Sequence, residues 1–321
     1  MLTDLFEELL SRRQFLRLGV HTMLGALAAS WWLPPRRLWA SSVAIPTRPL
    51  GQTGVQVTIV GLGGEGVLRS WGREREAAAL IHRALDLGIT YCDTAPAYSG
   101  SQDYYGAVLA ERRREIFLAS KTHDRSRDGS LRLLEESLRR LNTDHLDLWQ
   151  LHNLNDVEEL ATIFSKRGAI HAFEEARRDG RVKFLGITGH YDPQVLVEAI
   201  RRYPFDTVLV ALNAADRARL SFIEQLLPVA NAHHLGIIGM KVAAKGALLR
   251  PAGIATMQEA LSYVLTLPIS TAIVGCTTPE EVEELVRIAT AFQPLPQAEV
   301  ARLEALASSY ANQASWFKRG S

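Results

Sequence analysis

Four side chains with acid-base chemistry lie at or near the ends of short apolar runs that are typical of buried strands. Asp93 ends the first run, and Tyr98 follows it in the next loop. Lys121 and His152 each end a later run of the same kind. A phenol, with a reference pKa of about 10, is a poor acid at neutral pH unless a neighbouring ammonium stabilises its anion. The four residue types together are therefore typical of proton transfer to an oxygen atom.

The elements that must position these residues alternate regularly along the chain. Predicted strands cover 57–62, 89–92, 116–120, 146–151, 182–187, 207–212, 237–240 and 269–274. Predicted helices cover 74–87, 103–113, 130–141, 169–178, 193–202, 218–234, 256–265 and 279–291. A hairpin around 52–54 precedes them, and a last helix at 297–311 follows. This order predicts parallel βαβ units and one closed (β/α)8 barrel, whose active face is at the carboxyl ends of the strands.

A glycine-rich segment offers a competing interpretation. Residues 61–66 read Gly-Leu-Gly-Gly-Glu-Gly and fit the dinucleotide fingerprint G-x-G-x-x-G after a strand. In a Rossmann fold the helix opens at once, whereas residues 67–73 intervene here before the predicted helix. Asp93 ends the next strand, but later than the fingerprint requires. The barrel interpretation is therefore preferred.

Composition narrows the class of protein. The chain is 47% hydrophobic and 22% charged, which is ordinary for a globular domain. Its formal net charge is +1, and the first forty residues contribute +2 of it, so no basic excess remains to predict a nucleic-acid partner. The two cysteines, Cys92 and Cys276, lie in apolar runs and are expected as buried thiols. The spacing of His123, His233 and His234 predicts no metal site.

Residues 1–40 are expected to be a signal peptide that is not part of the fold. Arg12 and Arg13 match the twin-arginine (Tat) export pattern, an apolar stretch follows at 18–33, and Ala40 is a candidate cleavage position. This predicts a periplasmic protein whose barrel domain covers 41–321, with the Tat machinery as a partner and only transient membrane contact. An uncleaved membrane anchor is the alternative, although sixteen residues are short for a span.

The set Asp93, Tyr98, Lys121 and His152 resembles the catalytic tetrad of the aldo-keto reductases. Residues 48–57 resemble the opening hairpin of that family, and residues 181–188 resemble its fifth strand. The resemblance implies a barrel enzyme that reduces an aldehyde or ketone to an alcohol by hydride transfer from NADPH or NADH. Its partner would be a small carbonyl substrate.

The resemblance also implies a role for each member of the tetrad. Tyr98 would be the general acid, and Lys121 would lower its pKa. Asp93 would hold Lys121 in place, and His152 would orient the carbonyl by a hydrogen bond.

Each of these roles has a structural alternative. Tyr98 has two nearby competitors, Tyr104 and Tyr105, and any of the three residues can be a packed aromatic side chain. Asp93 and Lys121 can form an ion pair that serves the fold alone. His152 can be a histidine whose hydrogen bonds are satisfied at the top of the barrel.

The expected cofactor contacts depart from the family pattern. They are Gly63, Thr188, Asn213, Met240, Lys241, Gly246, Gly275, Glu281 and Glu284. Thr188 is followed by Gly189 and His190, where many members have an amide side chain. Gly275 and Glu281 stand where many members have a lysine and an arginine for the 2′-phosphate of NADPH. A missing cation and an added anion predict that NADPH is bound no better than NADH.

A second function is open to a chain of this family. Some members are partner subunits of channels, so the fold alone does not decide between an enzyme and a nucleotide-binding sensor of low turnover. The two functions differ in whether the protein turns over a reactive aldehyde or only binds the nucleotide.

Overall fold

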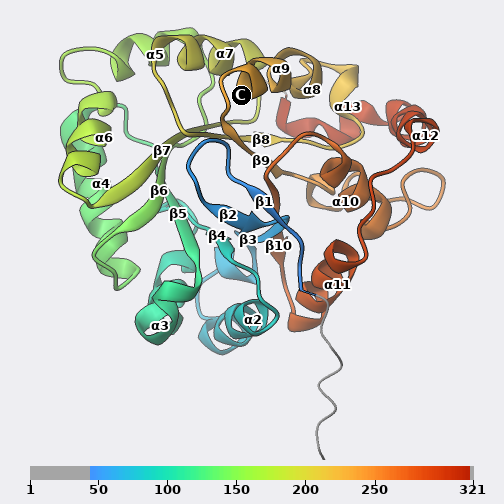
Figure 1. Ribbon diagram of the computed structural model, residues 1–321, viewed down its shortest axis with the longest axis horizontal. Helices are drawn as coiled ribbons and strands as arrows, with labels where there is room; N and C mark the ends of the chain where they lie inside the picture. The colour runs from blue at the N-terminus through green and yellow to red at the C-terminus, as the bar shows by residue number, and fades with distance from the viewer. Residues whose placement is uncertain (1–43, 319–321) are drawn as a thin grey trace, which may run out of the picture. The chain divides into compact units, whose positions relative to one another are not determined.

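The computed structural model describes residues 44–318, which form a closed barrel of parallel strands (Figure 1). The barrel strands are β3 (Val60–Gly66), β4 (Tyr91–Asp93), β5 (Phe117–Thr122), β6 (Leu146–Leu151), β7 (Val182–Gly189), β8 (Thr207–Ala211), β9 (Gly236–Met240) and β10 (Thr271–Cys276). They pair in chain order, and β10 closes the barrel against β3. The predicted (β/α)8 fold is confirmed. The expected signal peptide at 1–40 lies outside the described residues.

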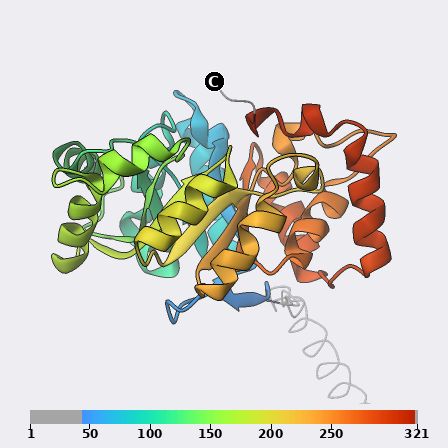
Figure 2. The same cartoon turned by 90° about the horizontal axis from the view of Figure 1, so that it is seen from above.

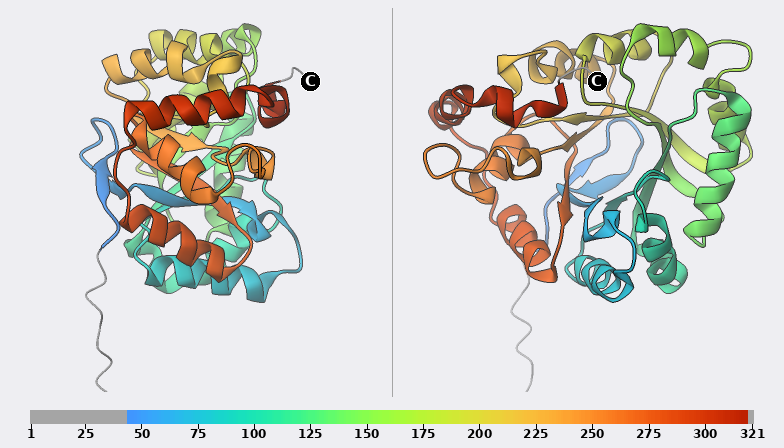
Figure 3. Two further views of the ribbon diagram at one scale, coloured as in Figure 1. Left: turned by 90° about the vertical axis from the view of Figure 1, so that its right-hand side faces the viewer. Right: turned by 180° about the vertical axis from the view of Figure 1, so that it is seen from behind.

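Helices surround the barrel on its outer side, as the two views in Figure 3 show. They are α2 (Glu74–Asp86), α3 (Ser101–Arg112), α4 (Arg127–Arg140), α5 (Val157–Ile163), α6 (Ala169–Arg178), α7 (Pro193–Arg202), α8 (Phe222–Gln225), α9 (Leu227–Ala232), α10 (Met257–Thr266), α11 (Pro279–Thr290), α12 (Gln297–Ser308) and α13 (Ala311–Ala314). Short 3-10 turns are η1 (Val67–Arg69), η2 (Arg113–Glu115), η3 (Asp216–Ala218), η4 (Ala244–Gly246) and η5 (Trp316–Lys318). Within this described part of the chain, none of the helices combines the length and apolar character that a membrane crossing requires.

The predicted hairpin is present and covers one end of the barrel (Figure 2). Its strands, β1 (Thr47–Pro49) and β2 (Gln56–Thr58), pair in antiparallel fashion. Leu50 and Val57 pack into the barrel interior. That interior core also contains Tyr91, Phe117, Ala119, Leu148, Leu209, Ile238, Met240 and Ile273. Side chains alternate along a strand, so residues two positions apart face the same way. Two positions beyond Tyr91, Ala119 and Leu148 stand Asp93, Lys121 and Gln150, which therefore also face inward, toward the opposite end of the barrel.

The first predicted strand was placed wrongly. Residues 57–62 divide between β2 and β3, and Ile59 lies between the two strands, where its N–H donates to Pro46 O. The barrel strand then continues through the glycine-rich segment to Gly66. Glycines carry no apolar side chains, so periodicity did not reveal this part of the strand. The G-x-G-x-x-G match therefore belongs to a barrel strand and does not form a Rossmann turn.

Two helical predictions also need correction. The helix expected at 218–234 is divided into α8 and α9, because Pro228 lacks an N–H and occupies the first turn of a new helix. Helix α5 was not predicted. Asp156 caps its first turn by accepting a hydrogen bond from Glu159 N–H at 2.8 Å.

Candidate active site

Neighbouring strand ends bring Asp93 and Lys121 together. Asp93 ends β4, and Lys121 lies near the end of β5, two residues beyond the register partner of Asp93. The two side chains form an ion pair, and each is only 1% exposed. Lys121 Nζ also donates to Thr94 O at 2.9 Å, and Gln150 Nε2 donates to Asp93 Oδ2 at 3.2 Å. The lysine is thus held by a buried carboxylate at the active face of the barrel.

Tyr98 lies over this ion pair. Lys121 Nζ is 4.8 Å from the centroid of the Tyr98 ring. The loop from β4 turns tightly, with Tyr98 N–H donating to Ala95 O at 3.0 Å. Gly64 on β3 leaves room for the ring, because a Cβ there would approach Tyr98 Cδ2 to 2.7 Å. A residue of the glycine-rich strand therefore helps to position the predicted acid.

His152 completes the predicted set. It follows β6 directly, and its backbone N–H donates to Thr122 O at 2.8 Å. Its ring meets the Tyr98 ring edge-on, with the centroids 5.6 Å apart and the planes at 83°. Burial, followed by the positive charge of Lys121, holds the pKa of His152 well below its usual range. The imidazole is consequently neutral at neutral pH, and its tautomer decides which nitrogen donates.

Burial and charge have opposing effects on the pKa values of Tyr98 and Lys121. Burial raises the pKa of Tyr98, and the opposing effect of Lys121 does not reverse this shift. Lys121 lowers the Tyr98 pKa as expected, but the effect of burial is larger. Burial alone would lower the pKa of Lys121, but Asp93 and Tyr98 together raise it, so the lysine stays charged.

The two competing tyrosines have structural roles. Tyr104 donates to Ser70 O at 2.8 Å and accepts from Arg73 N–H at 3.1 Å. Tyr105 is fully buried and donates to Leu62 O at 3.4 Å. Neither side chain lines a cavity at the active face, whereas Tyr98 lines two.

Two adjoining cavities open beside Tyr98. The first, which we call the polar cavity, has a volume of about 880 Å³ and is lined by residues from most of the loops that follow the barrel strands. The second, which we call the groove, has a volume of about 610 Å³ and runs past β3, β9 and β10. The residues that line both are Glu65, Tyr98, His190, Lys241 and Lys245. Tyr98 therefore lies where the two cavities meet.

Most of the predicted cofactor contacts line the groove. They are Gly63, Met240, Lys241, Gly246, Gly275, Glu281 and Glu284. Thr188 and Asn213 are buried outside its lining. Thr188 Oγ accepts from Asn153 N–H at 2.7 Å, and Asn213 bonds to Ala215 N–H and Lys241 O. These two side chains hold the loops around the groove, and the direct cofactor contacts expected of them stay predictions.

The loop after β9 has the features of an anion site. Three of its non-glycine residues have positive φ, namely Lys241 at 59°, Ala244 at 50° and Lys245 at 56°. Such backbone costs on the order of 1 kcal/mol or more per residue and occurs preferentially at ligand sites. The N–H groups of Ala244 and Gly246 donate to Lys241 O and Ala243 O at 2.8 Å, so an anion at this loop would be held mainly by the lysine side chains. The two ammonium groups suit the pyrophosphate of a dinucleotide.

The far end of the groove carries acids. Glu281 Oε2 accepts from Thr277 N–H at 2.5 Å, so this side chain caps the first turn of α11 as well as lining the groove. Glu284 lies 3.9 Å from Arg287, which does not line the groove. Among the described residues, the cations that do line the groove are Lys241 and Lys245, near the Tyr98 end.

Sequence reasoning missed several residues at the junction. Glu65 is held by Arg69 at 2.6 Å, Lys245 at 3.2 Å and Lys241 at 3.6 Å. Burial alone would raise the pKa of Glu65, but these three cations lower it, so the carboxylate is charged. His190 lies beside it, with its pKa lowered to about 3 by burial and by Lys241. Nothing in the glycine-rich segment 61–66 singled out Glu65, its one acidic residue, as part of a site.

The chain terminus also contributes to the site. Trp316 and Phe317 line the polar cavity, and Trp316 Nε1 donates to Ala244 O at 3.3 Å. Lys318 anchors this segment: it is 1% exposed, pairs with Asp216 and donates to Leu220 O at 2.8 Å. No local sequence signal links the terminus to a barrel loop about seventy residues earlier. Within residues 44–318, no cluster of His, Cys, Asp or Glu is suited to a metal ion.

Comparisons with known proteins agree with this geometry. The model of the Aldo/keto reductase family matches residues 60–253, and the matched segment contains the whole tetrad. The chain is 28% identical over 297 residues to L-galactose dehydrogenase from Arabidopsis thaliana, covering 78% of this chain and 90% of that protein. Two other curated relatives are matched over only 53% and 66% of their own length.

Solved structures support the same assignment. An aldo-keto reductase from Bacillus halodurans in its holo form is 25% identical, with a TM-score of 0.69, and the match covers 82% of this chain and 96% of that one. An aldo-keto reductase from Klebsiella pneumoniae in complex with NADPH is 24% identical, with a TM-score of 0.67, covering 79% and 92%. This chain belongs to the aldo/keto reductase family of oxidoreductases.

Proposed function

We propose that the protein reduces an aldehyde or ketone to an alcohol with NADPH or NADH. The single observation that carries this proposal is the position of Tyr98, which lies where the polar cavity and the groove meet and is backed by the Lys121–Asp93 ion pair. A carbonyl in the polar cavity and a dinucleotide in the groove would come together at this phenol. The products would be the alcohol and the oxidised dinucleotide, with one proton taken up.

The groove residues fit a nicotinamide dinucleotide. Lys241 and Lys245 would hold the pyrophosphate, and Glu281 lies toward the adenosine end. The Klebsiella protein of the same fold is described with NADPH. When bound, such a dinucleotide supplies a hydride to the carbonyl carbon.

The protein's own residues would then handle the developing charge on oxygen. Neutral His152 donates a hydrogen bond that orients the carbonyl, and Tyr98 donates its hydroxyl proton to the oxygen. The ammonium of Lys121 stabilises the resulting phenolate, and Asp93 keeps that ammonium in place. Trp316 and Phe317 form part of the wall of the polar cavity.

Replacement of Tyr98 by phenylalanine tests this proposal. The substitution removes one hydroxyl and keeps the ring that packs against Gly64, so folding and nucleotide binding should change little. With a reactive aldehyde, kcat should fall by at least about 10²-fold, the contribution typical of a general acid. Full activity in Tyr98→Phe would contradict the assignment. No turnover in the wild type, with nucleotide firmly bound, would favour the sensor function instead.

The choice between NADPH and NADH follows from the acids at the far end of the groove. Gly275 supplies no cation there and Glu281 adds an anion, so neither favours a 2′-phosphate. We expect the dissociation constants of NADPH and NADH, measured by fluorescence titration, to be similar or to favour NADH. An affinity for NADPH about a hundredfold higher, or about 2.7 kcal/mol, would mean that another cation binds the phosphate. Lys241 and Lys245, the cations that line the groove among the described residues, would be tested first.

We also propose that the protein is exported to the periplasm. The proposal is supported by the twin-arginine pattern at Arg12 and Arg13, which is outside the described residues. Export machinery reads this pair as a specific signal, so replacing both residues by lysine should leave the protein in the cytoplasm although the charge is kept. Unchanged fractionation of the Arg12→Lys, Arg13→Lys variant would rule out this route.

A further inference from the structure

The polar cavity has an unusual charge distribution for a site that only needs to admit a neutral carbonyl. Among the described residues that line it, the cationic side chains are Arg69, Arg125, Lys241 and Lys245, and the carboxylate is Glu65. The two lysines also line the groove, where a pyrophosphate would meet them. Arg69 and Arg125 line the polar cavity alone, and each is paired with one carboxylate, Glu65 and Glu159 respectively.

We propose that the substrate carries an oxyanion, either a carboxylate or a phosphate, in addition to its carbonyl, and that Arg69 and Arg125 bind this anion. The inference rests on the proposed function, because it takes the carbonyl to lie against Tyr98. It adds a substrate class that the tetrad does not specify. Guanidinium groups suit this role, since their paired donors match the two oxygens of a carboxylate or phosphate.

Arg69 is close to the reacting end of the cavity. Its guanidinium carbon lies 5.0 Å from the centroid of the Tyr98 ring, and its Nη1 donates to Glu65 at 2.6 Å. The side chain is 40% exposed, so donors remain for a ligand. Glu65 has two further cationic partners in Lys241 and Lys245, and it can therefore share Arg69 with an incoming anion.

Arg125 has one donor group that no protein atom satisfies. Its Nη2 donates to His152 O at 2.9 Å, to Asn153 O at 3.0 Å and to Glu159 at 2.9 Å. Its Nη1 is buried and has no hydrogen-bond partner within residues 44–318. Buried donors without partners are rare and costly, so a small movement that brings Nη1 against a bound anion would be favourable.

The neighbouring histidines report the same positive field. After burial, the largest contributions that lower the pKa of His152 and His190 come from Lys121 and Lys241, and Arg125 adds to the shift in His152. Both imidazoles are therefore neutral and do not add to the charge. A cavity lined mainly by one sign of charge attracts ligands of the opposite sign.

The test uses two pairs of aldehydes, and in each pair one member carries an anionic group that the other lacks. With saturating cofactor at pH 7, 4-carboxybenzaldehyde is compared with methyl 4-formylbenzoate, and glyceraldehyde 3-phosphate with glyceraldehyde. We expect kcat/KM to favour the anion of at least one pair by about tenfold or more, as hydrogen bonds to charged groups allow. The preference should shrink as salt is added, because the cavity is open to solvent. The pair in which the anionic aldehyde has the higher kcat/KM shows whether the site prefers a carboxylate or a phosphate.

Two variants locate the effect. Arg69→Gln and Arg125→Gln should each raise KM for the favoured anion more than KM for its neutral partner, so that the preference for the anion shrinks. If Arg125→Gln only displaced the loop that carries His152, both substrates of a pair would lose activity equally. Arg178→Gln removes the same charge from a residue whose side chain is 74% exposed on α6, and it should leave the preference intact.

The outcomes separate this inference from the proposed function. Normal reduction of the neutral aldehydes, with no preference for the anion in either pair, would overturn the inference and leave the reductase function standing. A preference that persists in both Arg69→Gln and Arg125→Gln would also overturn it. No reduction of any of the four aldehydes would remove the proposed function, and the inference would fall with it.

Discussion

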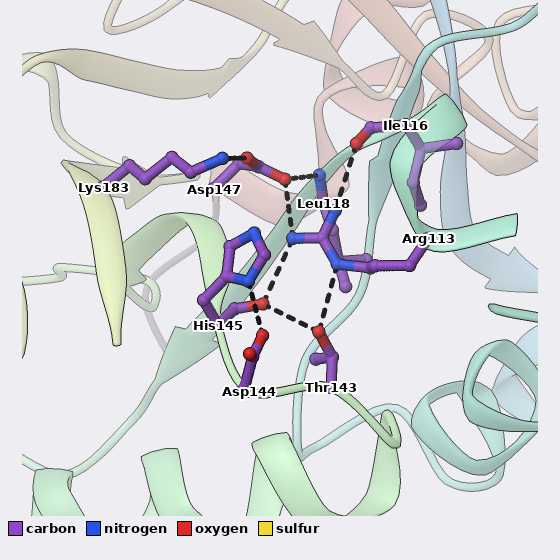
Figure 4. Close-up of polar contacts among 8 residues, drawn as sticks. All are labelled: Arg113, Ile116, Leu118, Thr143, Asp144, His145, Asp147 and Lys183. Carbon is purple, nitrogen blue, oxygen red and sulfur yellow. Dashed lines mark hydrogen bonds and ion pairs between the residues drawn. The ribbon is translucent and has the colours of Figure 1, made fainter. Parts of the chain in front are cut away.

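Two buried aspartates at opposite ends of the barrel have opposite electrostatics. Asp147 lies at the start of β6 and accepts from Leu118 N–H, Arg113 and Lys183 at 2.7–2.9 Å (Figure 4). Burial alone would raise the pKa of Asp147, but these partners lower it. Burial does raise the pKa of Asp93, even though Lys121 is paired with it.

The difference concerns the two networks and not the whole of either end of the barrel. Among the described residues, no side-chain nitrogen or oxygen of the Asp147 network is buried without a partner, although Tyr91, Thr207 and Thr271, each the first residue of its strand, do carry such an atom. At the active face such atoms occur on Arg125, Gln150, Asn153 and His190. A fully bonded network stabilises the fold, whereas unpaired polar atoms around a cavity are available to a ligand.

The largest effect on activity is expected from Lys121→Met. The phenolate of Tyr98 would lose its charge partner, and kcat should fall by at least about 10²-fold. The unfolding free energy should also fall, because Asp93 would be left buried without its partner. Steady-state kinetics and urea titration measure the two quantities. If Lys121→Met lost much stability but kept its kcat, the Lys121 end of the barrel would serve the fold and not the reaction, which would contradict the comparison.

The largest effect on stability is expected from Asp147→Ala. The substitution strips the buried partner from Arg113 and from Leu118 N–H, and it should cost about 3 kcal/mol of unfolding free energy, as when a buried pair is broken. The folded protein should keep its kcat. Lys183→Met is the matched control: Lys183 is 53% exposed, so its loss should cost less than about 1 kcal/mol. If Asp147→Ala and Lys183→Met lost the same unfolding free energy, Asp147 would contribute no more than an exposed ion pair does.

The smallest effect is expected in the pH dependence of the rate. Reduction requires protonated Tyr98 and neutral His152. Since burial raises the pKa of Tyr98 above 10.0, the rate of carbonyl reduction should decline only at pH values above about 10. The pKa of His152 is lowered well below 6.5, so the rate should not decline at pH 6. A decline between pH 7 and 9 in kcat for reduction would show that another group, or a bound cofactor, controls the proton.

The sequence predicted the tetrad because chemistry and strand ends coincide there. Asp93, Lys121 and His152 each follow an apolar run, and parallel strands must bring such ends together. The residues around them were harder to find. Glu65 is part of a glycine-rich strand, and Trp316 reaches the site from the chain terminus, so neither has a local pattern. The sequence shows the lysine near Tyr98, whose effect on the Tyr98 pKa has the expected sign, but not the burial that outweighs this effect.

The groove was predicted in outline but not atom by atom. Matching positions pointed to Met240, Lys241 and Glu281, which do line it. The same matching pointed to Thr188 and Asn213, whose side chains turn out to be bonded to neighbouring loops. Which way a side chain faces depends on loop conformations that strand periodicity does not report.

A double-mutant cycle on kcat tests most directly whether Tyr98 and Lys121 act as one proton-donating unit. Tyr98→Phe, Lys121→Met and the double variant are compared with the wild type under saturating cofactor and aldehyde. If Lys121 acts through the phenol, the double variant should be only slightly slower than the slower single variant, because residues that act as a unit are non-additive. Losses that multiply fully in the double variant would contradict a coupled pair and with it the proposed chemistry at the junction of the two cavities.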